Sequence, residues 1–458
     1  MTGFRDVVVL LPGITGSVLA DKNGKEVWSP SGGALWRAIT SFGGSITGLE
    51  LASDDADGGV TAPRLIPDVT IIPGFIKIDG YTRIREFLIE QLGLVDGQNF
   101  HAFPYDWRLD NRVNAKRLQS QAMDWLKQWR ASSGATDARL ILIGHSMGGL
   151  ILRYFLECLG GWMDTRTLIT LGTPHRGSLN AIDFLVHGMK KSIGPLGLDL
   201  TPLLRSYTSV YQLLPIYPCI DAGGPENARV AHAAQDGLLP NVDVVRALAA
   251  RAFHVEIETQ QARNAKDGKY TEQGYTMVPL VGTEQPTFQS ARVGGGKVEL
   301  LRTWQGEDTA GDGTVPRGSA TPLELDDAER ELYTAETHGS LQNAVGTLDN
   351  LKGILTRDHV AFKKMRSASM PIALSMELDD VVLPGQPLTV RVKPLERNPK
   401  VSVLLTPLAG GEVIEDTLER GTDGWQMGEF NVAAGSWRVT ASADGASTIN
   451  DLVVVAAS

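Results

Sequence analysis

The chain has 458 residues, which is more than one ordinary domain needs, so its length predicts two or three domains. Its formal net charge of -10 argues against a nucleic-acid partner and against a polybasic grip on anionic lipid. Hydrophobic residues make up 42% of the chain, which is ample for a large core.

The cysteine content and the N-terminus bear on location. The only cysteines are Cys158 and Cys219, and neither belongs to a C-x-x-C pair. Two unpaired thiols in a reducing compartment are the default interpretation, while a single bridge between them stays open. Only Arg5 precedes the first apolar run, which ends early at Pro12-Gly13, so no secretory signal is expected. Arg153 interrupts the most apolar region, so no membrane span is expected. Because neither a secretory signal nor a span is expected, we expect a cytoplasmic protein.

Short apolar strands alternate with amphipathic helices through the first two-thirds of the chain. The continuous apolar run Val7–Leu11 predicts a strand that is buried on both faces. Apolar residues spaced three and four apart then predict helices over Tyr81–Leu92 and about Arg112–Arg130. The runs Leu140–Ile143 and Leu168–Leu171 predict two further strands. Strand, helix and strand in this order imply a mostly parallel sheet with helices on both faces.

A long segment from about Ile182 to Lys266 contains several prolines and interrupts the alternation. An insertion of this size is typical of a lid over a site or of a covering subdomain. Its leucines are candidates to line an apolar trough: Leu196, Leu198, Leu203, Leu204, Leu213 and Leu214. Strand patterns resume at Met277–Val281 and Val298–Trp304.

The composition changes after about Arg366, where 367–371 looks like a linker. Short apolar runs separated by turn residues follow, at Leu388–Val392, Val401–Leu405, Trp437–Ala441 and Leu452–Val455. They predict an antiparallel, immunoglobulin-like β-sandwich over 371–458, beside a catalytic unit over 1–366. We expect the sandwich to take no part in the chemistry. Trp425 or Trp437 on its surface is a candidate anchor for a protein partner or a membrane interface.

The pentapeptide Gly144-His145-Ser146-Met147-Gly148 has the form G-x-S-x-G between a predicted strand and a predicted helix. In that context the pattern is typical of a strained turn that presents a serine, here Ser146, as a nucleophile. The backbone N–H of Met147, at the start of the helix, can donate to a substrate oxyanion.

A second oxyanion donor is expected from the loop after the first strand, where Pro12–Ser17 follows the apolar run directly. We predict the N–H of Ile14 as this donor and Thr15 as a substrate-facing neighbour. The alternative is a plain turn that ends the strand.

A nucleophilic serine needs a histidine base that is oriented by a carboxylate. In this topology the order along the chain is serine, acid, histidine. His338 follows a strand-like run and opens a loop that enters a helix, so it is the predicted base, with His359 as the alternative. Asp312 stands between two glycines in a turn and is the predicted acid, whereas Asp308 looks like a solvated loop charge.

These pieces together resemble the lecithin:cholesterol acyltransferase family, which includes lysosomal phospholipase and phospholipid:diacylglycerol acyltransferase relatives. The matching stretches are Leu11–Ser17, Pro104–Arg108, Gly144–Gly149, Gly172–Gly177 and Gly311–Pro316. The resemblance implies an α/β-hydrolase fold with Ser146, Asp312 and His338 in the catalytic places. The loop after the first strand lacks the cysteines of the family's secreted members, but its Trp28 and Trp36 suit an apolar acyl chain or a lid contact.

The sequence therefore predicts a serine-dependent acyl hydrolase or acyltransferase for glycerolipid esters, with peripheral membrane contact as an option. Neither a metal nor an organic cofactor is required. Hydrolysis and transfer differ only in what deacylates the acyl-enzyme, so the sequence does not separate them. A small-molecule carboxylesterase and a binding protein that keeps the hydrolase fold stay open as alternatives.

Overall fold

The computed structural model describes residues 4–29, 49–51, 59–67, 70–72, 76–193, 196–325, 331–356, 372–421 and 423–456. Trp36, His359 and the linker predicted at 367–371 lie outside these residues.

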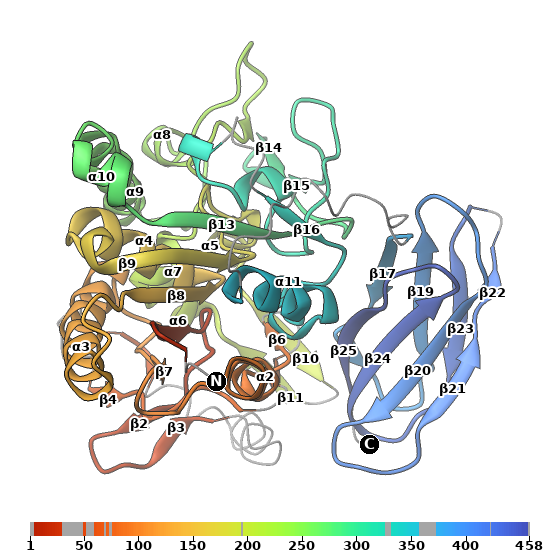
Figure 1. Cartoon of the computed structure of the whole chain (residues 1–458). Helices are drawn as coiled ribbons and strands as arrows, with labels where there is room; N and C mark the ends of the chain where they lie inside the picture. Colours follow the sequence, from red (N-terminus) through yellow and green to blue (C-terminus); the bar gives the residue numbers. More distant parts are fainter. Residues whose placement is uncertain are drawn as a thin grey trace.

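A six-stranded sheet in the order β16-β13-β9-β8-β1-β7 forms the centre of the N-terminal part (Figure 1). All neighbouring strands in it are parallel. The strands are β1 (Val7–Leu11), β7 (Phe100–Ala102), β8 (Leu140–His145), β9 (Thr165–Leu171), β13 (Thr276–Gly282) and β16 (Leu332–Thr334). Every residue of β1 and β8 is buried, which explains why their sequences are continuous apolar runs.

Helices pack around the sheet in two groups, and the members of each group contact one another. They are α3 (Asn111–Ser133), α4 (Met147–Cys158) and α9 (Val244–Asn264) in one group, and α2 (Thr82–Leu92) and α11 (Val345–Leu355) in the other. A parallel sheet with packed helices defines an α/β fold. Among the residues described, no helix is long and apolar enough to cross a membrane. Cys158 and Cys219 are both free.

The segment predicted as an insertion is largely helical. Besides α9 it contains the end of α5 (Leu179–Val186), α6 (Thr201–Ser206), α7 (Thr208–Tyr211) and α8 (Val230–Gln235). Leu203, Leu204 and Leu214 are buried in the main core, so they do not line a trough. The side chains of Leu196 and Leu198 lie outside the described part of the chain.

The strand predicted at Val298–Trp304 is β15 (Lys297–Leu301), and it does not join the central sheet. It pairs with β14 (Ser290–Gly294), which in turn pairs with β12 (Ile220–Asp221). The chain therefore leaves the central sheet after β13 and returns to it only at β16.

The C-terminal part contains two sheets whose neighbouring strands are antiparallel apart from the β18–β25 pair (Figure 1). One has the order β17-β19-β23-β22 and the other the order β18-β25-β24-β20-β21. The strands are β17 (Leu374–Leu378), β18 (Val381–Val382), β19 (Leu388–Pro394), β20 (Val401–Pro407), β21 (Ile414–Thr417), β22 (Glu419–Arg420), β23 (Gln426–Phe430), β24 (Gly435–Ala443) and β25 (Ile449–Val455). Alternate residues of β19 are buried, and both sheets contribute to one hydrophobic cluster.

Of the two tryptophans of this part, Trp425 alone stays a candidate surface anchor. Trp437 is buried, and its Nε1–H donates to the carbonyl of Ala433. Trp425 is half-buried, with the guanidinium of Arg391 4.7 Å from its ring centre.

The domain boundaries predicted from the sequence, 1–366 and 371–458, stay predictions.

Candidate active site

The residues that follow the parallel strands meet at one edge of the central sheet. The carboxyl ends of parallel strands lie on the same edge, which is where sites form in open α/β sheets. Ser146 follows β8 and His338 comes shortly after β16. Gly13 follows β1 and lies so close that a Cβ on it would be 2.9 Å from Ser146 Cβ.

Ser146 occupies a sharp turn between β8 and α4, with φ 52° and ψ −126°. A positive φ is strained for a residue with a side chain and is typical of functional positions. The flanking glycines are required sterically. A Cβ on Gly144 would lie 2.7 Å from the nitrogen of Gly149, and one on Gly148 would lie 2.5 Å from the carbonyl oxygen of Pro12.

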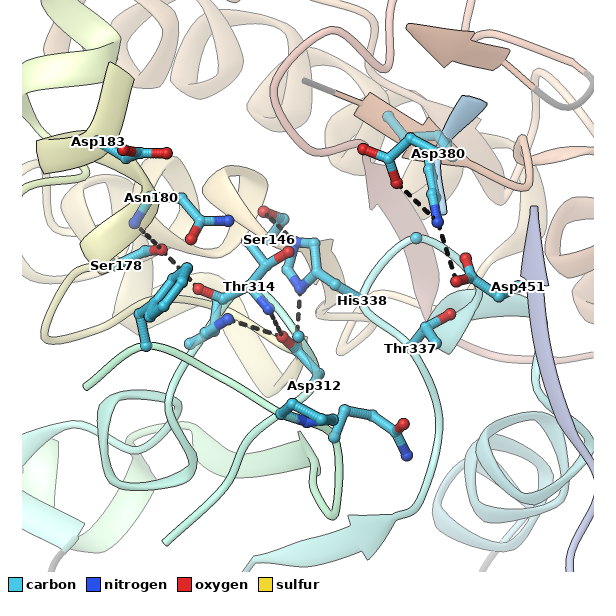
Figure 2. Close-up of a pocket in the computed structure, with 18 of the residues that line it drawn as sticks. Ser146, Ser178, Asn180, Asp183, Asp312, Thr314, Thr337, His338, Asp380 and Asp451 are labelled. Atoms are coloured by element: carbon cyan, nitrogen blue, oxygen red, sulfur yellow. Dashed lines mark hydrogen bonds and ion pairs between the residues drawn. The ribbon is translucent and has the colours of Figure 1, made fainter. Parts of the chain in front are cut away.

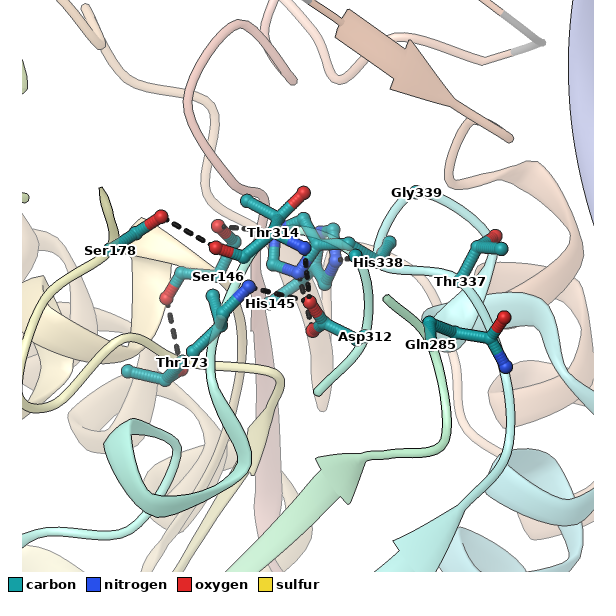
Figure 3. Close-up of polar contacts among 12 residues, drawn as sticks. His145, Ser146, Thr173, Ser178, Gln285, Asp312, Thr314, Thr337, His338 and Gly339 are labelled. Carbon is teal, nitrogen blue, oxygen red and sulfur yellow. Dashed lines mark hydrogen bonds and ion pairs between the residues drawn. The ribbon is translucent and has the colours of Figure 1, made fainter. Parts of the chain in front are cut away.

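Figure 3 shows the polar contacts that join Ser146, His338 and Asp312. His338 Nε2 lies 2.9 Å from Ser146 Oγ, and His338 Nδ1 lies 2.7 Å from Asp312 Oδ2. Asp312 is 1% exposed, and its other carboxylate oxygen accepts from the N–H groups of Thr314 (2.9 Å) and Val315 (2.7 Å). In such an arrangement the imidazole can take a proton from the serine hydroxyl while the carboxylate fixes its orientation.

The loop that holds Asp312 is anchored to β13, although it follows β15 in the chain. The N–H of Gln285 donates to the carbonyl of Gly311 at 2.8 Å. Asp312 also packs against Gly282 at the end of β13, because a Cβ there would lie 2.4 Å from Asp312 Cβ. Asp312 lies between Ser146 and His338 in the chain, as predicted. The strand that supports it is β13, however, and not the strand β15 that precedes it in the chain.

A second polar chain runs behind the serine and was not predicted. The N–H of Gly13 donates to the Tyr81 hydroxyl at 2.8 Å, and this hydroxyl lies 2.8 Å from His145 Nδ1. His145 Nε2 lies 3.1 Å from the carbonyl oxygen of His338, which can only accept, so Nε2 carries the proton and the Tyr81 hydroxyl donates to Nδ1. Burial, reinforced by repulsion from His338, lowers the pKa of His145 to about 3 and keeps the ring neutral.

The predicted oxyanion donors are the backbone N–H groups of Ile14 and Met147. Ile14 lines the pocket together with Ser146. Met147 begins α4, so its N–H is one of the amide groups that have no acceptor within the helix. That these two N–H groups face a substrate oxyanion stays a prediction.

The Pro104–Arg108 stretch supports the turn after β1. The Tyr105 hydroxyl donates to the carbonyl of Pro12 at 2.8 Å, and Trp107 Nε1–H donates to the carbonyl of Ser17 at 3.1 Å. From the sequence, this stretch could be identified only as a family motif. Its supporting role could not be predicted, because it depends on contacts between residues that are distant in the chain.

Thr15 and Trp28, predicted to bind substrate, are not among the residues that line the pocket. Thr15 is fully buried, and its hydroxyl donates to the carbonyl of Ile14. Trp28 packs edge-on against Trp107 with ring centres 5.1 Å apart, so its apolar surface is already covered. The structure therefore corrects the substrate-contact prediction for both residues.

A pocket of about 670 Å³ opens beside Ser146 (Figure 2). Its apolar lining includes Ile14, Phe184, Val210, Leu213 and Phe288. The C-terminal part supplies a further wall, made of Met376, Glu377, Leu378, Asp379, Asp380, Thr389, Arg391 and Asp451. The C-terminal part therefore borders the pocket, and the expectation that it takes no part in the chemistry stays a prediction.

The parallel sheet and the strained serine turn between β8 and α4 together define the class as an α/β-hydrolase-like protein. The family model for lecithin:cholesterol acyltransferase matches residues 75–289, so over this region the chain is similar to that family. The motif stretches Pro104–Arg108, Gly144–Gly149 and Gly172–Gly177 lie within the matched region.

Individual relatives cover only parts of the chain. Lecithin-cholesterol acyltransferase-like 4 of Arabidopsis thaliana is 25% identical over 236 residues, which is 45% of this chain and 42% of that protein. A triacylglycerol lipase of Pseudarthrobacter phenanthrenivorans is 38% identical over 94 residues, which is 20% of this chain and 27% of that protein. The chain spans less than half the length of the curated relatives that it matches first. A solved Bacillus licheniformis lipase in propeptide form is 15% identical with a TM-score of 0.31, over 98% of this chain and 73% of that chain.

Proposed function

We propose that this chain is a serine-dependent acyl hydrolase or acyltransferase that acts on the ester bonds of glycerolipids. The observation that carries the proposal is the hydrogen-bonded series from Asp312 through His338 to Ser146 at a strained turn. The names of the relatives, an acyltransferase-like protein and a triacylglycerol lipase, support lipid esters as the substrate class.

The geometry supports a two-step reaction. Ser146 Oγ attacks the acyl carbonyl carbon while His338 Nε2 takes the hydroxyl proton, and the carboxylate of Asp312 stabilises the imidazolium. His338 then gives this proton to the departing alkoxide. The alcohol is released, and the acyl group remains bound to Ser146 as an ester. Water or an alcohol attacks that ester, gives its proton to His338 and releases the acyl group, after which the proton returns to Ser146. Water gives hydrolysis and an alcohol gives transfer.

The N–H groups of Ile14 and Met147 act as the oxyanion donors in this proposal. Each donor of this kind lowers the barrier by about 3 kcal/mol in enzymes that use one. The glycine next to Ile14 keeps the backbone close enough for this role.

Two features of the architecture refine the proposal. The helix α5 and the segment up to Leu213 act as a cap over the pocket, since Phe184, Val210 and Leu213 line it. The two C-terminal sheets form a β-sandwich, which their shared hydrophobic cluster supports.

Two free cysteines support a cytoplasmic location. A membrane contact and a protein partner stay predictions.

The test is covalent labelling with a fluorophosphonate probe, which reacts with activated serines. The wild-type chain should be labelled and should turn over an ester, and Ser146→Ala should lose both while it keeps its thermal unfolding transition. Ser132→Ala, at an exposed serine near the end of α3, is the matched control and should be labelled like the wild type. Labelling mapped to another serine would contradict the assignment of the nucleophile. An unlabelled wild type would point to a binding protein.

The length of the acyl chain in the preferred substrate distinguishes a lipase from a carboxylesterase. The proposal predicts a higher kcat/KM for long-chain glycerolipid esters than for short soluble esters, because the pocket wall is partly apolar. A preference for short esters would favour the carboxylesterase instead.

A further inference from the structure

The C-terminal strands contact the chain directly before His338. Asn450, on β25, donates from its backbone N–H to Glu336 Oε1 at 2.9 Å and from Nδ2 to Glu336 Oε2 at 3.0 Å. The hydroxyl of Thr337 donates to the carbonyl of Asn450 at 2.8 Å. Both residues that precede His338 are therefore held by one residue of the C-terminal part.

A second contact holds the chain directly after His338. Lys77 Nζ lies 2.8 Å from Asp380 Oδ1 and 2.9 Å from Asp451 Oδ2, and both carboxylates belong to the C-terminal part. Figure 2 shows Asp380 and Asp451 on the same side of the pocket as Thr337. The Lys77 backbone lies against Gly339, where a Cβ would be 1.7 Å from the Lys77 carbonyl oxygen. The N–H of Asp79 also donates to the carbonyl of Gly339 at 2.9 Å.

These contacts are shielded from water. Glu336 is 1% exposed, and both of its carboxylate oxygens are bonded. The Lys77 and Asp451 side chains are 18% and 12% exposed, whereas Asp380, at the rim of this contact, is 34% exposed. Buried polar groups lose the most free energy when a partner is removed, so they fix positions more firmly than surface pairs do.

We propose that the C-terminal unit, residues 372–456, positions His338 against Ser146, and that Asn450 is a positioning residue for the proposed reaction. The inference rests on the proposed function, because it assigns His338 the role of the base. The N-terminal part holds the backbone of His338 itself, because its N–H donates to the carbonyl of Asp312 at 2.8 Å and its carbonyl accepts from His145 Nε2. Asn450 adds the constraint on the two residues before it. Asn450 contacts neither substrate nor reacting atoms and acts only through Glu336 and Thr337.

Exchange of donor and acceptor gives a sharp test. Asn450→Asp puts an acceptor where Nδ2 donated to Glu336, and Glu336→Gln puts a donor opposite Nδ2. In the double variant, the amide introduced at position 336 can donate to the carboxylate introduced at position 450, so the hydrogen bond returns with its direction reversed. The matched control is Asn398→Asp in the same unit. The Asn398 side chain accepts from Gln426 and does not touch the histidine loop, which is the segment between β16 and α11 that carries His338.

The measurement is kcat and KM for a short soluble ester in the full-length chain, at a pH above the range in which Glu336 titrates. Each rate is divided by the number of sites that a fluorophosphonate probe labels, so that unfolded molecules are not counted. We expect each single variant to lose roughly 10- to 100-fold in kcat with little change in KM, because small displacements of a catalytic group cost this much. The double variant should recover most of the loss, and Asn398→Asp should match the wild type.

The outcomes separate this inference from the proposed function. An unlabelled, inactive wild type would refute the proposed function itself. An active wild type with unchanged kcat per labelled site in both single variants would refute only the positioning role. A rise in kcat would also refute it, and would identify the C-terminal unit as an obstruction. A loss that the double variant does not recover would show that the Glu336–Asn450 hydrogen bond is not the cause.

Discussion

Tyr81 joins the turn after β1 to the histidine loop through a single hydroxyl group. This hydroxyl accepts from the N–H of Gly13 and donates to His145, whose other nitrogen donates to the carbonyl of His338. The side chain is 1% exposed, so no water replaces these bonds if the hydroxyl is removed.

Tyr81→Phe should therefore lower both stability and turnover. It leaves the Gly13 N–H and His145 Nδ1 unpaired and buried, which costs about 1–3 kcal/mol of unfolding free energy. Urea unfolding and kcat for a soluble ester are the measurements. Tyr333→Phe is the control, because Tyr333 is 47% exposed. Equal stability of the two variants would show that the polar chain behind the serine contributes nothing.

At the scale of elements, the start of α4 packs unusually close to the segment after β9. A Cβ on Gly149 would lie 2.0 Å from Thr173 Oγ1, and that hydroxyl donates to the carbonyl of Ser146 at 2.9 Å. The helix that follows the serine is thus held by a contact that only a glycine permits.

Gly149→Ala should destabilise the fold by about 1–3 kcal/mol, the usual cost of an overpacked contact. It should also lower kcat, because Thr173 must move away from Ser146. Gly353→Ala, in α11, meets no atom within 4 Å and serves as the matched control. That variant should gain about 0.5–1 kcal/mol from helix propensity. Urea unfolding measures the free-energy change of both variants. A Gly149→Ala variant as stable and active as the wild type would contradict the close packing.

At the scale of the whole molecule, the two parts meet through buried carboxyl groups. Burial, together with the nearby charge of Asp451, raises the pKa of Glu336 from 4.5 to about 7 against the lowering effect of its hydrogen bonds. Asp451 itself faces Lys77, whose ammonium group is its ion-pair partner. The contact between the parts therefore depends on pH near neutrality.

The sign of that dependence follows from proton binding. Between pH 4.5 and about 7 the folded state keeps a proton on Glu336 that the unfolded state has lost, so wild-type stability falls as pH rises through this window. Each unit of pKa shift corresponds to about 1.4 kcal/mol. Glu336→Gln cannot titrate, so its stability relative to the wild type should rise across the window and level off above it. Chemical unfolding at several pH values measures this, and a constant difference would show that Glu336 has an ordinary pKa.

The sequence alone pointed to Ser146, because the nucleophile turn is a local pattern in which strand, glycines and helix lie within a few residues. His338 and Asp312 could be predicted from their order along the chain, and the strands of both parts from their apolar periodicity. Tyr81 and Asn450 carried no such signal, because 64 residues separate Tyr81 from His145 and 114 separate Asn450 from Glu336. The same reason explains why Trp28 was wrongly expected at the pocket and why the C-terminal wall of the pocket was not predicted. Local chemistry and periodicity are written in neighbouring residues, whereas the walls of the pocket and the support of its histidine arise only when distant segments pack together.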